Sequence, residues 1–148
     1  MITIRTGANG DIPALADIWR RSVTATHTFL TPNDIDALES EVRQGLGMLE
    51  LYVAEDDGVP KGFMAMHANM IEALFLDPAY MGKKLGTRFI EYAKELRGRD
   101  TELQVDVNEQ NPEALGFYLA KGFKQTGRSD IDSAGRPWPL LHLVLSSA

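Results

Sequence analysis

Hydrophobic positions along this chain recur with two periods, one typical of helices and one typical of strands. Apolar residues three and four positions apart predict amphipathic helices over residues 12–23, 32–46, 86–97 and 112–121. Alternating apolar and polar residues, or a short apolar run, predict strands over residues 1–5, 49–54, 62–67, 71–76, 101–107, 123–131 and 138–145. The pair Asp57-Gly58 between the second and third of these strands is a hairpin-turn signal.

The order of these elements predicts the fold class. One strand is followed by two helices, three strands, a helix, a strand, a helix and two strands. Because strands and helices do not alternate regularly, we predict an α+β fold with a single mixed sheet rather than a doubly wound one. Residues 71–76 are almost all apolar, which indicates a strand buried on both faces. The last two strands form a hairpin, whose exposed edge makes a homodimer an option.

Length, charge and composition narrow the classes of function. A chain of 148 residues corresponds to one domain. Acidic residues outnumber Lys and Arg by 21 to 15, and the net charge of −6 argues against a nucleic-acid or membrane-surface partner. Cysteine is absent and the three histidines are scattered, so we expect no metal site and no cysteine nucleophile. The sequence shows no secretory signal and no apolar run of membrane-spanning length, which favours a cytoplasmic protein.

The segment Leu74–Gly86 combines the end of a strand, a glycine-containing loop and the start of a helix. The first amides of a helix lack partners within it and carry partial positive charge, so this junction is suited to bind an anion. Residues 78–90 include three basic residues and no acidic one. A phosphate-bearing ligand fits this loop, although a solvated basic loop without a ligand would have the same composition.

A second segment, Asn108–Phe123, contains the last predicted helix. Asn111 is a strong helix cap, and its side chain could contact a ligand instead. Tyr118 could act as a proton donor, because a phenol with a pKa of about 10 is protonated at neutral pH and can protonate a departing thiolate. Alternatively, Phe117 and Tyr118 form a pair of aromatic core residues.

These two segments together resemble the GNAT superfamily of acyl-CoA-dependent N-acetyltransferases. The coenzyme loop of that family follows the pattern [QR]-x-x-G-x-[GA] after a strand that ends in an L-x-V-x-P-like run. Leu74, Leu76 and Pro78 match the run, and Gly86 matches the last loop position. The second segment matches the pattern N-x-x-A-x-x-F-Y-x-x-x-G-F. Residues 22–30, 107–118 and 127–141 are most similar to the YjaB-like bacterial acetyltransferases within the superfamily.

The resemblance covers almost the whole chain and implies one acyl-CoA N-acyltransferase domain over residues 1–148. The fold it implies is a mostly antiparallel sheet of about seven strands with four helices and a central pair of strands that splay apart. The implied activity is direct transfer of an acetyl group from acetyl-CoA to a primary amine of a small molecule or peptide, without a metal ion. The absence of cysteine, which excludes a cysteinyl acyl-enzyme, agrees with direct transfer.

The resemblance also implies roles for individual residues. Tyr118 would stabilise or protonate the departing thiolate, and Asn111 would contact the pantetheine arm. Glu72 is the candidate base for the amine, because it lies two residues before Leu74 and so on the same strand face, and His67 is a weaker candidate. Coenzyme contacts are expected from the strand residues Leu74 and Leu76 and from the loop residues Met81, Gly82, Lys83, Lys84, Leu85 and Gly86. Acceptor contacts are expected from His27, Phe29 and Trp138.

Two loop positions depart from the family pattern. Met81 occupies a position where Gln or Arg is usual, and Lys84 occupies one where glycine is usual. Loss of the glycine reduces backbone freedom at the pyrophosphate, whereas an ammonium group there can contact a phosphate. A non-catalytic or weakly active module that binds or senses acyl-CoA is therefore the alternative to a catalytic acetyltransferase.

The acidic residues are unevenly distributed along the chain. Residues 34–57 contain eight acidic residues and one basic residue, Arg43. We expect part of this acidity to face the acceptor site and attract a cationic amine.

Overall fold

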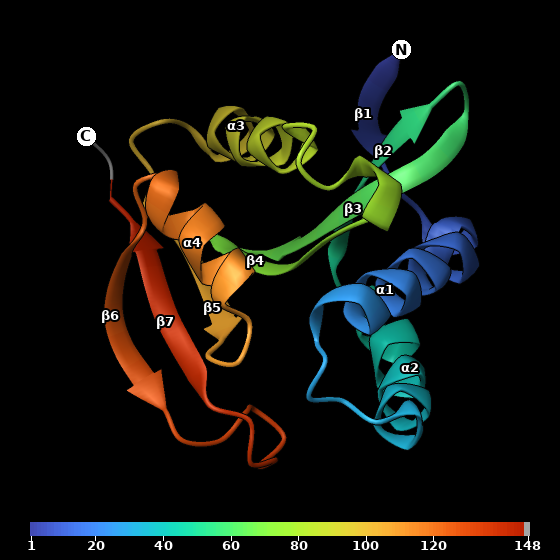
Figure 1. Cartoon of the computed structure of the whole chain (residues 1–148). Helices are drawn as coiled ribbons and strands as arrows, with labels where there is room; N and C mark the ends of the chain where they lie inside the picture. Colours follow the sequence, from blue (N-terminus) through green and yellow to red (C-terminus); the bar gives the residue numbers. More distant parts are fainter. Residues whose placement is uncertain (147–148) are drawn as a thin grey trace.

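The computed structural model describes residues 1–146, which form one sheet with helices on both faces (Figure 1). The strands are β1 (Ile2–Thr6), β2 (Glu50–Asp56), β3 (Val59–His67), β4 (Met70–Leu76), β5 (Leu103–Asn108), β6 (Lys124–Ser129) and β7 (Leu140–Leu145). The helices are α1 (Ile12–Thr26), α2 (Pro32–Leu46), α3 (Leu85–Arg97) and α4 (Pro112–Ala120), together with the 3-10 helices η1 (Asn9–Asp11) and η2 (Pro78–Tyr80).

The strands lie in the order β1-β2-β3-β4-β5-β7-β6. All neighbours run antiparallel except β4 and β5, which are parallel. The α+β class and the single mixed, mostly antiparallel sheet are thus confirmed. The predicted C-terminal hairpin is also confirmed, with β6 as an edge strand of the sheet.

β4 and β5 are paired over a short stretch only. Met70 lies opposite Gln104 and Ile71 lies opposite Val105, and these are the two pairs that join the strands within residues 1–146. Beyond them the strands diverge, as the family resemblance implied. One edge of the remaining part of β4 therefore has no strand beside it.

The prediction that residues 71–76 are buried on both faces is wrong. Ile71 is buried, whereas Leu74, Phe75 and Leu76 are only half-buried. The reason is the divergence of the two strands, because the free edge of β4 borders a cavity rather than another strand. An apolar strand that lines a cavity has the same composition as one that is fully enclosed.

A β-bulge interrupts the pairing of β3 with β4 at Glu72. Consecutive residues of β3 pair with Ala73 and Ile71, so Glu72 is an extra residue in β4. The bulge shifts the side-chain alternation, and Ile71 and Leu74 consequently pack in the same hydrophobic cluster. The regular period of two residues that placed Glu72 on the face of Leu74 therefore does not hold across the bulge, although both residues line the cavity described below.

Two hydrophobic clusters hold the helices against the sheet. On one face, α1 and α2 pack against β2 and β3 through Leu15, Ile18, Trp19, Val23, Ile35, Leu46, Leu51, Val53, Phe63 and Ala65. On the other face, α3 and α4 pack against β3, β5 and β7 through Met64, Met66, Leu85, Phe89, Ile90, Ala93, Leu103, Val105, Val107, Tyr118, Leu141 and Leu143. Figure 1 shows α1 and α2 beside one half of the sheet and α4 against the other half.

Local chemistry fixes where two of the helices begin. The hydroxyl of Thr31 accepts a hydrogen bond from the amide of Asp34, and the Asp34 carboxylate accepts one from the amide of Thr31. This reciprocal capping box starts α2. Asn111 caps α4 by accepting a hydrogen bond from the amide of Ala114, and Pro112 follows in the first turn, where its missing N–H costs nothing.

The contact between α3 and α4 gives a prediction for stability. A Cβ atom added at Gly86 would lie 3.0 Å from Cζ of Phe117, tighter than most Cβ contacts in proteins, so the Phe117 ring would have to shift. We expect Gly86→Ala to lower the free energy of unfolding by about 1–3 kcal/mol, measured by urea denaturation. Gly116→Ala in α4 is the matched control: its added Cβ meets no described atom within 4 Å beyond its immediate chain neighbours and helix backbone, so stability should rise by up to about 1 kcal/mol. Equal effects would contradict this packing.

Candidate active site

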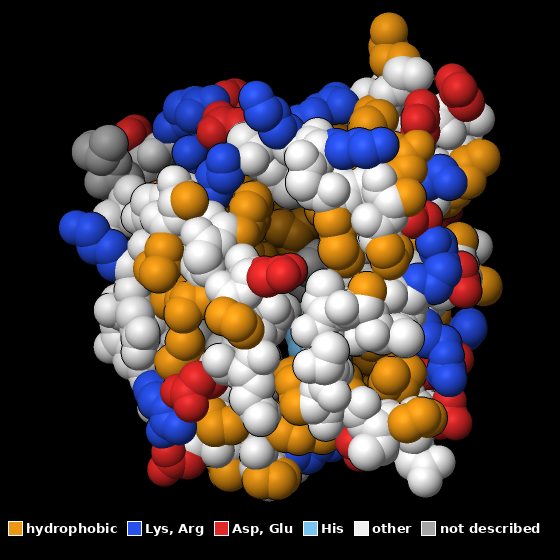
Figure 2. Space-filling view, viewed as in Figure 1, with side chains coloured by type: hydrophobic (Ala, Val, Ile, Leu, Met, Phe, Trp, Pro, Cys, Tyr) orange, Lys and Arg blue, Asp and Glu red, His pale blue; other side chains and the backbone are white. Residues whose placement is uncertain are grey.

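A cavity of about 320 Å³ opens where β4 and β5 diverge. Its walls come from the end of α1, the outer parts of both strands, the loop before α3 and the first turns of α4. Figure 2 shows the hollow at the centre of one face, lined by apolar side chains. Basic side chains gather above it, over α3, and an acidic side chain lies at its lower rim.

Backbone amides are presented at one end of the cavity by the loop that leads into α3. Within the described part of the chain, the amides of Gly82, Lys84, Leu85 and Gly86 have no hydrogen-bond partner. Gly82 has a φ of 77° and Lys84 a φ of 65°, and these left-handed residues turn the chain into the helix. Free amides at a helix N-terminus are what a phosphate group requires. The loop therefore presents free amides of the kind that a phosphate-bearing ligand needs.

The predicted coenzyme residues differ in where their side chains lie. Met81, Gly82, Gly86, Leu74 and Leu76 line the cavity. Three others lie outside the cavity lining, with Leu85 buried in the core and Lys83 and Lys84 exposed. Leu85 can therefore contribute a backbone amide to a ligand but not its side chain.

Tyr118 serves as a core residue and also reaches the cavity. Its ring packs between Phe117 and Phe123, with centroid distances of 5.1 and 5.3 Å. The hydroxyl of Tyr118 has no hydrogen-bond partner among the described residues. No side-chain oxygen of these residues is both fully buried and without a partner. The Tyr118 hydroxyl is therefore not fully buried, and it is open to the cavity that the residue lines. Burial raises the pKa of Tyr118 well above its ordinary value. The phenol is therefore neutral at neutral pH, and its hydroxyl can donate a hydrogen bond to a ligand in the cavity.

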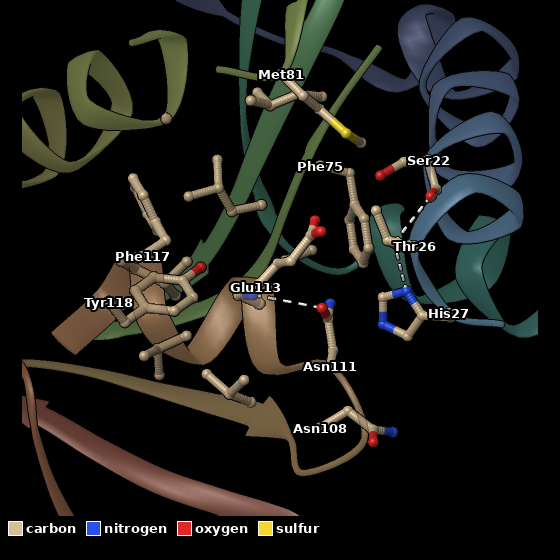
Figure 3. A pocket seen from close by; sticks show the side chains of 18 of the residues that line it. Ser22, Thr26, His27, Phe75, Met81, Asn108, Asn111, Glu113, Phe117 and Tyr118 are labelled. Carbon is tan, nitrogen blue, oxygen red and sulfur yellow. Dashed lines mark hydrogen bonds between the residues drawn. The ribbon is translucent and has the colours of Figure 1, made fainter. Parts of the chain in front are cut away.

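Asn111 caps α4, and its side chain also lies at the cavity. It is buried and lines the cavity. Its Oδ1 accepts the capping hydrogen bond from Ala114 at 3.3 Å, which leaves its Nδ2 group for a ligand (Figure 3).

The predicted acceptor residues form an aromatic cluster, and one of them lines the cavity. His27, directly after α1, is the cavity residue. Its ring lies 5.6 Å from that of Phe29 and 6.4 Å from that of Phe75, measured between centroids. Trp138 meets Phe29 edge to face at 6.0 Å. Phe29 and Trp138 lie outside the cavity lining and support His27 by linking the loop after α1 to the loop between β6 and β7.

The acidic side chains at the cavity are not those we expected. Glu72, Asp106 and Glu113 line it, whereas none of the eight acids in residues 34–57 does. The hypothesis that this acidic segment faces the acceptor site is wrong, because most of its carboxylates are held elsewhere by ion pairs with distant arginines. These pairs are Asp36 and Glu39 with Arg20, Glu41 with Arg136, Glu50 with Arg97, and Glu55 with Arg5. His67, the weaker base candidate, is exposed at the end of β3 and lies outside the lining.

A polar chain that no sequence pattern revealed runs from β5 through β7 to β6 beside the cavity. Oδ1 of Asp106 lies 2.6 Å from Nδ1 of His142, and Nε2 of His142 lies 2.7 Å from Oγ of Ser129. Alternation along β5 could have placed Asp106 on the face opposite its buried neighbours. The pairing of β5 with β7, which brings His142 opposite Asp106, cannot be deduced from local pattern.

Within residues 1–146, no group of three or more His, Asp or Glu side chains could hold a metal ion. No helix there is long and apolar enough to span a membrane.

Comparison with known proteins identifies the family. The "Acetyltransferase (GNAT) domain" family matches residues 15–138. The chain belongs to the GNAT family of acetyltransferases. It is 43% identical over 145 residues to the peptidyl-lysine N-acetyltransferase YjaB of Salmonella typhimurium (strain LT2), which covers 97% of this chain and 98% of that relative. The solution structure of apo-form YjaB from Escherichia coli matches with a TM-score of 0.89 and 41% identity over 100% of this chain and 99% of that one.

A more distant structure shares the fold. The PaiA N-acetyltransferase of Thermoplasma acidophilum, solved in complex with coenzyme A, matches with a TM-score of 0.78 and 22% identity over 96% of this chain and 98% of that one. Membership of the GNAT family makes this chain an acetyl-CoA-dependent N-acetyltransferase. The resemblance inferred from two sequence segments is confirmed, and the catalytic alternative is favoured over a binding module.

Lys84 provides a test of strain in the coenzyme loop. A non-glycine residue in the left-handed region strains the folded chain by about 1–2 kcal/mol. Glycine avoids this strain, but it lowers the free energy of unfolding by about 0.4–1 kcal/mol because it makes the unfolded chain more flexible. We expect Lys84→Gly to raise the free energy of unfolding by up to about 1 kcal/mol in urea denaturation. Lys83→Gly is the control, because Lys83 is not in the left-handed region and gains nothing from glycine. A loss of stability in Lys84→Gly as large as in the control would contradict the strain.

Proposed function

We propose that this GNAT protein transfers the acetyl group directly from acetyl-CoA to a primary amine. The proposed acceptor is the ε-amine of a lysine in a peptide, and a small-molecule amine is the alternative acceptor. The observation that carries the proposal is one cavity lined by a free phenol and by three carboxylates. Support for a peptide acceptor comes from the relatives at 41–43% identity, which are named peptidyl-lysine N-acetyltransferases.

The coenzyme is proposed to lie along the divergence of β4 and β5. The free amides of residues 82 and 84–86 would hold its pyrophosphate. The free edge of β4 at Leu74 and Leu76 would pair with the pantetheine arm, and Nδ2 of Asn111 would donate to it. Acetyl-CoA supplies the activated thioester, and the chain supplies position and charge.

The acceptor end of the cavity suits a lysine side chain. Glu72, Asp106 and Glu113 place negative charge around the cavity, which favours an approaching ammonium group. His27 and Phe75 offer a partly aromatic wall against which the aliphatic stem of lysine can pack. Both features favour a long cationic side chain over an anionic substrate.

The proposed reaction is a direct displacement. The neutral amine nitrogen attacks the thioester carbon, and a new C–N bond forms. Backbone amides at the free edge of β4 stabilise the negative charge on the carbonyl oxygen. The C–S bond then breaks, and the departing thiolate takes the proton of the Tyr118 hydroxyl.

The remaining expectations concern the domain organisation, the cellular location and the partners of the chain. We propose that the chain acts as a single acyltransferase domain over residues 1–148 and in the cytoplasm. The homodimer and the lack of a nucleic-acid partner stay predictions.

Tyr118→Phe tests the proposed proton donor. The change removes a hydroxyl but keeps the ring that packs between Phe117 and Phe123, so the fold and coenzyme binding should be preserved. We expect kcat to fall by about 100-fold or more, measured as thiol release from acetyl-CoA with a lysine peptide. The Kd for acetyl-CoA, measured by calorimetry, should stay within about 3-fold of the native value. A 3-fold change in Kd corresponds to a change of about 0.7 kcal/mol in binding free energy. Unchanged turnover would refute the role of Tyr118.

A further inference from the structure

We propose that His27 is the general base that takes the proton from the acceptor amine, and that Thr26 holds its ring in the protonation form required. This inference rests on the proposed function, because a lysine ammonium must lose a proton before its nitrogen can attack. It deepens that function by naming the base, a role that sequence reasoning gave to Glu72.

The hydrogen bonds of Thr26 fix which ring nitrogen of His27 carries the proton. Oγ1 of Thr26 lies 2.9 Å from the carbonyl oxygen of Ser22 and 2.8 Å from Nδ1 of His27 (Figure 3). A carbonyl oxygen can only accept, so the single hydroxyl proton of Thr26 is donated to Ser22. Oγ1 must then accept the second bond from His27, which places the ring proton on Nδ1. Nε2 is left unprotonated with a free lone pair.

That free nitrogen faces the cavity. His27 lines the cavity, and in Figure 3 its second ring nitrogen points away from α1 toward Asn111. The backbone at this position is fixed, because the amide of His27 donates to the carbonyl of Val23 at 2.7 Å and its carbonyl accepts from the amide of Leu30 at 3.0 Å. The rings of Phe29 and Phe75 pack against the imidazole. The lone pair is therefore held in one direction.

The surroundings keep the ring neutral before the reaction. Burial among these aromatic groups lowers the pKa of His27 below its ordinary value. Among the described residues, the ionisable groups that line the same cavity are Glu72 on β4, Asp106 on β5, and Glu113 and Tyr118 on α4. An imidazole is the side chain suited to accept a proton near neutral pH, so His27 is the group assigned this role. The carboxylates serve instead to attract the cation.

The proton balance of the reaction closes with His27 and Tyr118 together. Nε2 of His27 takes one proton from the lysine ammonium, which frees the nitrogen lone pair for attack. The C–N bond forms, the C–S bond breaks, and Tyr118 gives its proton to the thiolate. As the amide forms, the attacking nitrogen loses a second proton to solvent. The Tyr118 phenolate takes up a proton from solvent in return, which restores its hydroxyl. The imidazolium then releases its proton from Nε2 to water, so one proton is released for each acetyl group transferred.

The decisive variant is His27→Asn, whose side-chain amide can still donate to Thr26 but has no counterpart of Nε2. We expect kcat with a lysine peptide to fall by about 100-fold or more at neutral pH, with unchanged affinity for coenzyme A. In the native chain, kcat/KM should fall as the pH drops through the lowered pKa of His27, because the base becomes protonated. This acid limb should be absent in His27→Asn, and the deficit should shrink at alkaline pH, where the amine is already neutral.

Control variants separate this role from a structural one. His67→Asn changes an exposed histidine outside the cavity and should leave kcat and the acid limb unchanged. Thr26→Val releases the ring but keeps His27, so kcat should fall less than in His27→Asn while the acid limb remains. Should His27→Asn fail to bind coenzyme A, His27→Gln takes its place.

The outcomes distinguish the two proposals. If His27→Asn or His27→Gln binds coenzyme A yet keeps the native turnover and the acid limb, His27 is not the base. If Glu72→Gln or Asp106→Asn removes the acid limb instead, that carboxylate is the base and the proposed function stands. If the native chain acetylates no lysine peptide and no small-molecule amine, the proposed function and this inference fail together.

Discussion

The structure depends on the early separation of two parallel strands. β4 and β5 share two residue pairs and then diverge, which opens the sheet at its centre while both halves remain continuous with their neighbours. A sheet opened in this way exposes a strand edge whose amides and carbonyls need partners. An extended ligand arm can supply them, so the same break both creates the cavity and defines how a coenzyme would lie in it.

Several contacts hold the two sides of this opening in place. Arg21 of α1 pairs with the buried Asp77 directly after β4, with 2.5 Å between nitrogen and oxygen. This ion pair ties the helix that ends beside His27 to the loop that presents the free amides. On the other side, an ion pair between Arg136 and Glu41 and the contact of Trp138 with Phe29 join the β6–β7 loop to the α1–α2 region. The coenzyme end and the acceptor end are thus linked through packed elements.

The features that the sequence predicted well are those set by neighbouring residues. The cap at Asn111, the helix start at Pro32 and the free amides before α3 depend on spacing within a few residues, and all are present. The bulge at Glu72 depends on how β3 pairs with β4, and no local pattern revealed it.

Features set by distant partners could not be predicted. The acids of residues 34–57 were expected at the acceptor site, but arginines from other elements hold most of them elsewhere. The ring form of His27 required α1 to continue to Thr26, beyond the predicted end at residue 23. In each case the outcome depended on which residues the fold brings together, and a single sequence does not encode that locally.

A crystal structure with a bisubstrate ligand would test most directly the claim that the opening between β4 and β5 is where transfer occurs. The ligand would join coenzyme A through an acetyl bridge to the ε-nitrogen of a lysine peptide. We expect the pyrophosphate on the amides of residues 82 and 84–86, the sulfur beside the hydroxyl of Tyr118 and the lysine nitrogen beside Nε2 of His27. A ligand bound outside the opening, or a lysine nitrogen remote from both Tyr118 and His27, would contradict it.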